Sequence, residues 1–86
     1  MRQHIKRLLD RLAQDYHRYE NSEISVEQLT KTISATNAAL DGSASSNLRQ
    51  ALHECETQVE LAVALLSKHE RDQRVSQLIR KVLESD

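Results

Sequence analysis

The sequence predicts an all-α protein, a small antiparallel bundle of three to four helices with a central hairpin. The 86 residues include no Pro, Phe or Trp and a single Gly, whereas residues that favour helices are common. Apolar residues recur at helical spacing along most of the chain. Serines that suit helix starts separate the apolar segments. The length fits one helical domain over residues 1–86.

A first helix is predicted over about residues 2–20. Its opposite side carries Arg7, Arg11 and Arg18, which makes the helix amphipathic and basic. A solvated charged face is the simplest interpretation, and docking on an acidic protein is the alternative. The apolar face is formed by Ile5, Leu8, Leu9, Leu12, Tyr16 and Tyr19.

A second helix is predicted over about residues 25–41. Ser25 and Gln28 have the spacing of a capping box, in which each side chain bonds to the other's backbone. The apolar positions are three and four residues apart, which resembles a heptad seam. They are Val26, Leu29, Ile33, Thr36 and Leu40.

The segment "DGSASSN" predicts a turn that makes the second and third helices an antiparallel hairpin. Gly42 suits a left-handed helix end, and either Ser45 or Ser46 can cap the third helix, over about residues 46–67. The seam of that helix comprises Leu48, Leu52, Cys55, Val59, Ala62 and Leu66. It is widened by Ala51, Leu61, Val63 and Leu65, so we expect this helix to be the central one.

The segment of about residues 68–85 is predicted to form either a fourth helix or a continuation of the third. Val75 lies about half a turn away from Leu66, so the two apolar sets cannot share one face of a straight helix. Capping-box spacing between Ser67 and Glu70 favours a turn, whereas the lack of Gly and Pro favours continuation. We expect a break or a kink. The displaced apolar set is Val75, Leu78, Ile79, Val82 and Leu83.

Two His-Glu pairs suggest a zinc-protease helix, but the pattern is incomplete. The motif requires a second histidine four residues after His53 or His69, where the chain has Thr57 and Gln73. Cys55 lies on the apolar seam with no cation one turn away, which predicts a core residue and not a reactive thiol. We therefore predict no enzyme activity, no metal site, no cofactor and no small-molecule substrate.

The charge pattern and hydropathy limit the partners and the compartment. The net charge of −1 argues against a dedicated nucleic-acid binder, which usually has a strong basic excess. No signal-peptide pattern or membrane-length apolar run is present, so a cytoplasmic location is expected. Acidic residues interrupt the basic first helix, and no Phe or Trp can anchor it, which argues against a membrane surface.

Two segments resemble bacterial protein families that act through helix–helix contacts. The stretch "ETQVELAVALLS", with the preceding hairpin, is similar over about residues 29–67 to the small helical-hairpin chaperones of type III secretion needle subunits. The start of the chain resembles the small anti-adaptor that protects the stationary-phase sigma factor from proteolysis. The shared positions there are Met1, Ile5, Leu8, Leu9, Leu12, Ala13 and Gln14. Neither likeness includes a diagnostic motif, so neither assigns a role to a residue.

The sequence therefore predicts a non-enzymatic protein–protein interaction module: a small regulator, adaptor or chaperone. A light core without large aromatic side chains favours self-association or a partner, as a homodimer or a hetero-complex. The alternative is a charge-driven nucleic-acid or membrane-surface binder that uses the first helix. The predicted partner surface comprises Val75, Leu78, Ile79, Val82, Leu83, Arg7, Arg11 and Arg18.

Overall fold

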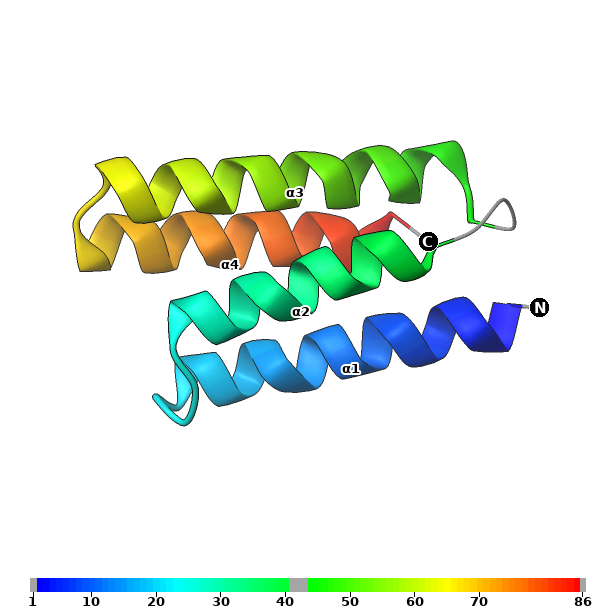
Figure 1. Ribbon diagram of the computed structural model, residues 1–86, viewed down its shortest axis with the longest axis horizontal. Helices are drawn as coiled ribbons and strands as arrows, with labels where there is room; N and C mark the ends of the chain where they lie inside the picture. Colours follow the sequence, from blue (N-terminus) through cyan, green and yellow to red (C-terminus); the bar gives the residue numbers. More distant parts are fainter. Residues whose placement is uncertain (1, 41–43, 86) are drawn as a thin grey trace.

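The computed structural model describes residues 2–40 and 44–85, which form four α-helices (Figure 1). The described residues include no strand, so the predicted all-α class is confirmed. The predicted Gly42 helix end lies outside the described residues. The helices are α1 (Arg2–Glu20), α2 (Val26–Ala39), α3 (Ser46–Leu65) and α4 (Lys68–Glu84).

Successive helices run in opposite directions, so the chain forms an up-down-up-down bundle (Figure 1). Each helix packs against two neighbours in a ring that α4 closes against α1. The predicted hairpin of α2 and α3 is present, but the closest-packed pair is α3 and α4, and the sparsest contact is between α1 and α4. The radius of gyration of 12.2 Å agrees with the roughly 12 Å expected for a compact domain of this length.

The core lies along the axis of the bundle and receives side chains from every helix. Leu12, Leu29, Leu52 and Val75, one from each helix, are all fully buried. Burying a side chain of this size stabilises the fold by roughly 1.5–3 kcal/mol. Because these residues recur at the predicted helical spacing, the apolar face of each helix is the one that the sequence indicates.

Serine side chains cap three of the helices. The Ser25 hydroxyl accepts a hydrogen bond from the backbone N–H of Gln28 at 3.2 Å, and starts α2 as predicted. At the start of α3 it is Ser45, and not Ser46, that accepts from the N–H of Leu48 at 3.1 Å. The structure therefore decides between the two serines that the sequence left open.

The chain breaks between α3 and α4, as expected. Leu66 leaves the helix with extended backbone angles (φ −105°, ψ 152°). Ser67 then caps α4: its hydroxyl accepts from the N–H of Glu70 at 3.5 Å and donates to the Glu70 carboxylate at 3.1 Å. This turn reverses the chain and lays α4 antiparallel to α3 (Figure 1).

None of the helices in the described part of the chain combines the length and the apolar character that a bilayer-spanning helix needs.

Candidate interaction surface

The displaced apolar set of α4 is buried within the chain. Val75, Ile79 and Val82 are at most 1% exposed, and Leu78 is 8% exposed, whereas Leu83 remains 37% exposed. The sequence suggested this set as a partner surface because it needs burial. The break at Ser67 turns α4 back onto the bundle, so the set is buried in the chain's own core. Leu83 is the member of the set that a partner can still reach.

The three arginines of the predicted basic face are exposed on α1, but acids lie among them. Arg7, Arg11 and Arg18 line a shallow depression together with Asp10 and Asp15. Arg18 and Asp15 form an ion pair at 3.6 Å. The outer surface of α1 is therefore mixed in charge, which gives little support to a nucleic-acid or membrane-surface role.

The residues that first suggest chemistry do not come together. His53 and His69 are exposed on different helices, and Cys55 is fully buried. Burial, together with the negative charge of Glu56, raises the pKa of the Cys55 thiol to about 12. A thiol with this pKa is protonated at neutral pH and is not an activated nucleophile. Within the described residues, no group of three His, Cys, Asp or Glu side chains could hold a metal ion.

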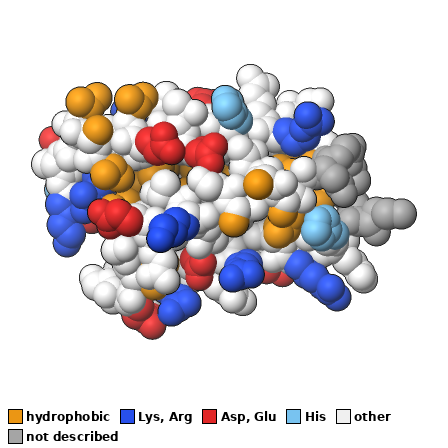
Figure 2. Space-filling model, in the orientation of Figure 1, with side chains coloured by type: hydrophobic (Ala, Val, Ile, Leu, Met, Phe, Trp, Pro, Cys, Tyr) orange, Lys and Arg blue, Asp and Glu red, His pale blue; other side chains and the backbone are white. Residues whose placement is uncertain are grey.

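The last two turns of α3 expose large apolar side chains. Leu65 is 76% exposed, Leu61 47% and Val63 36%. Hydrophobic side chains gather at the end of the molecule where α3 ends, with acidic side chains beside them (Figure 2). Neighbouring exposed leucines make this end of α3 a candidate contact surface.

Two of these residues share one face of the helix with Ala64. Leu61, Ala64 and Leu65 are at positions i, i+3 and i+4, so their side chains form one stripe, which we call the α3 apolar surface. Val63 lies on the other flank of α3. The stripe points away from the buried seam, on which Val59 and Ala62 are almost fully covered.

Sequence reasoning assigned Leu61, Val63 and Leu65 to the core, and the structure corrects that assignment. A helix in a four-helix bundle buries one face, whereas the segment from Val59 to Leu66 is apolar on most sides. The excess was visible in the sequence. The apolar run from Val59 to Leu66 is wider than the single stripe that a helix buries in a bundle.

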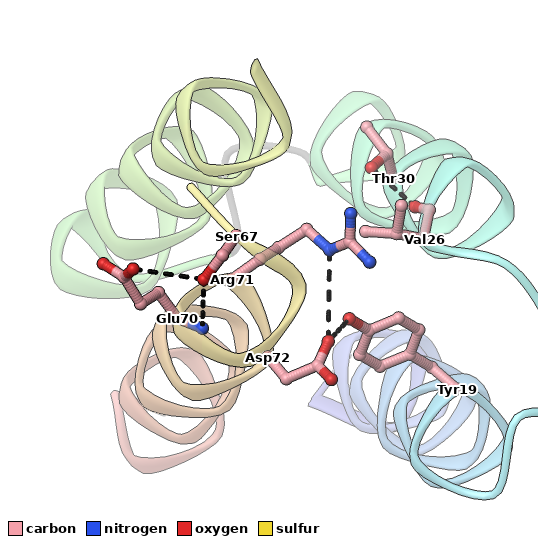
Figure 3. A network of polar contacts seen from close by, with 7 residues as sticks. All are labelled: Tyr19, Val26, Thr30, Ser67, Glu70, Arg71 and Asp72. Carbon is pink, nitrogen blue, oxygen red and sulfur yellow. Dashed lines mark hydrogen bonds and ion pairs between the residues drawn. The ribbon is translucent and has the colours of Figure 1, made fainter. Parts of the chain in front are cut away.

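A groove lies at the same end of the bundle, between the end of α1, the start of α2 and the first half of α4. Its volume is about 1080 Å³, and it is open to solvent. The Tyr19 hydroxyl donates to the Asp72 carboxylate across it (Figure 3). Arg71 points from α4 toward α2, and its Nε atom is buried, lacks a hydrogen-bond partner among the described residues and lies 4.0 Å from Asp72.

The charges around this groove are mixed. Its lining includes Lys68 and Arg71 as well as acidic side chains from all three elements. The acidic side chains are Glu20, Glu23, Glu27 and Asp72. This arrangement selects neither an anion nor a cation. The groove therefore supports no specific ligand, and the α3 apolar surface is the better candidate site.

Comparisons of the chain with family models, with curated proteins and with solved structures gave no match.

Proposed function

We propose that this protein is a non-enzymatic interaction module, a small regulator, adaptor or chaperone subunit, that binds another protein through the α3 apolar surface. The observation that carries the proposal is the exposure of Leu61 and Leu65 side by side on a helix whose other face is buried. Removing two such side chains from water supplies a few kcal/mol of association free energy, at roughly 25 cal/mol per Å² of apolar area.

The total surface of the chain supports the same conclusion. Its accessible area is 5687 Å², roughly a tenth more than the ~5200 Å² expected for a monomeric protein of this mass. A bundle of this length has little apolar side chain to spare for its core. Leucines left on the surface contribute little to the stability of the isolated chain, and their burial against a partner would stabilise the complex.

The proposal is tested with a double variant, Leu61→Ser with Leu65→Ser. Both side chains are exposed in the folded chain, so we expect the melting temperature to stay within a few degrees of the wild type. We expect the amount of protein captured from a lysate of the native host to fall at least tenfold. Capture is quantified by mass spectrometry, and the molar mass of each variant by light scattering.

Leu83→Ser is the matched control, because it removes an exposed leucine from α4 and leaves α3 unchanged. We expect this variant to capture the same proteins as the wild type. The proposal fails if the double variant captures them equally well. It also fails if the wild type captures nothing specific and is monomeric.

A further inference from the structure

The ionisable side chains beside the α3 apolar surface on the same helix are acidic. Glu54, Glu56 and Glu60 occupy the central turns of α3, and no Lys or Arg follows Arg49 in this helix, whose remaining ionisable nitrogen group is that of His53. Glu56 accepts a hydrogen bond from the Asn37 amide at 3.4 Å. Glu60 is exposed and has no ion pair among the described residues.

The neighbouring edge of α4 adds charges of both signs. Lys81 pairs with Glu54 at 3.4 Å, and this pair shows the register of the antiparallel helices. Counting along both helices from this pair places Arg74 level with Leu61 and Glu70 level with Leu65. The two α4 charges offset each other, as do those of the ion pair. Glu60 then leaves the border of the surface negative.

A second copy of the chain is a poor match for this surface. Symmetric pairing of α3 with α3 brings two borders of the same negative charge together, and like charges across an interface are unfavourable. Outside α3, the large hydrophobic side chain exposed in the described residues is Leu83, which is close in sequence to Arg80, Lys81 and Glu84. Its contact with α3 of the next copy is head-to-tail, and such contacts form open chains unless the rotation closes a ring.

We propose that the α3 apolar surface binds an amphipathic helix of another protein, whose apolar stripe is flanked by Lys or Arg. This inference rests on the proposed function and adds the chemistry of the partner. The stripe of Leu61, Ala64 and Leu65 packs against the partner's apolar residues, and small Ala64 allows the two helices to approach closely. The partner's cations lie beside Glu60, where opposite charges favour binding.

Two synthetic helical peptides test the inference. Both carry leucines at the same i, i+3, i+4 and i+7 positions, and the flanking residues are Lys in one and Glu in the other. Binding to the full chain is measured by fluorescence anisotropy at low and at physiological salt. We expect the Lys peptide to bind roughly tenfold more tightly than the Glu peptide at low salt, and the preference to shrink as salt screens the charges.

Variants of the chain show which residues determine the affinity for each peptide. Glu60→Lys weakens binding of the Lys peptide, Arg74→Glu strengthens it, and Leu65→Ser weakens binding of both peptides. Glu84→Lys, which changes an exposed acid near the other end of α4, is the matched control and leaves the affinities unchanged. Circular dichroism melting of each variant shows that the fold is intact.

Several outcomes overturn the inference. Equal affinity for the two peptides shows that charge does not select the partner, and absence of binding by the wild type shows that the surface does not take such a helix. A doubled molar mass that returns to the monomer value in Leu65→Ser identifies a second copy as the occupant. The proposed function is decided separately, by the capture experiment with the double serine variant.

Discussion

The hydroxyl of Tyr19 donates a hydrogen bond to the carboxylate of Asp72, which lies 53 positions further along the chain. This bond joins the end of α1 to the first half of α4, the pair of helices with the sparsest contact in the bundle. It therefore closes the ring of helices where two neighbouring helices pack least closely.

Loss of the Tyr19 hydroxyl is expected to weaken the bundle. Tyr19→Phe keeps the ring but leaves Asp72 without its donor, so we expect the free energy of unfolding to fall by about 1 kcal/mol. The matched control is Tyr16→Phe, whose hydroxyl bonds at 3.2 Å to Glu20 within the same helix and near solvent. Urea denaturation followed by circular dichroism measures both. An equal loss in the two variants contradicts a specific role for the bond between α1 and α4.

The two adjacent serines at the start of α3 are expected to differ. Ser45→Ala removes the hydroxyl that accepts from the Leu48 N–H, and we expect a cost of about 1 kcal/mol. Ser46→Ala changes an exposed side chain inside the first turn and is expected to cost less than about 0.5 kcal/mol. Urea denaturation compares them. A larger loss for Ser46→Ala means that the cap has been assigned to the wrong residue.

Within the displaced apolar set of α4, Leu78 is buried and Leu83 is exposed, so substitutions at the two positions are expected to differ in their effect on stability. Leu78 is 8% exposed, so we expect Leu78→Ala to destabilise the fold by roughly 2–5 kcal/mol. Leu83 is 37% exposed, and Leu83→Ala is expected to cost less than about 1 kcal/mol. Thermal melting of both variants checks this order. Similar losses indicate that α4 does not fold onto α3 as the structure shows.

Stability is expected to decrease in alkali because of Cys55. Its thiol has a pKa of about 12 in the folded chain, against 9.0 in the absence of burial. The unfolded thiol therefore loses its proton first, so this contribution is complete below about pH 9 and is lost as pH rises toward about 12. At 1.36 kcal/mol per unit of pKa, the loss is at most about 4 kcal/mol.

Urea denaturation at pH 8, 10 and 11 measures this loss of stability. We expect the loss to be smaller in Cys55→Ala. Some decrease remains in that variant, because burial also raises the pKa of Tyr16 and Tyr19. The same sign applies to both tyrosines, since the unfolded chain ionises first. An equally steep decrease in wild type and Cys55→Ala contradicts the assignment to the thiol.

Much of the fold was predictable because its signals are local. Ser25 and Ser67 mark helix starts through hydrogen bonds to residues three positions ahead, and such contacts can be inferred from short stretches of sequence. The periodicity of Leu12, Leu29 and Leu52 likewise identified the faces that are buried.

The candidate site was not predictable in the same way. Val75 and Leu65 are both apolar residues near the break at Ser67, yet one is fully buried and the other is 76% exposed. Local sequence gives each an apolar preference but does not state how much apolar surface the neighbouring helices can cover. The sequence therefore places Leu61 and Leu65 in the core, and it places in the partner surface several α4 residues that the structure buries.

The sequence alone determined that this protein is helical, about where its helical segments lie and which side of each carries the apolar seam, because these properties depend on residues within a few positions of one another. Only the tertiary structure decided which apolar residues remain outside. Once Ser67 turns α4 back onto α3, the apolar set around Val75 fills the core. The face of α3 that carries Leu61 and Leu65 then has no neighbouring helix in the bundle to cover it. Leu61 and Leu65 are exposed because four helices in a ring can bury only one face of each.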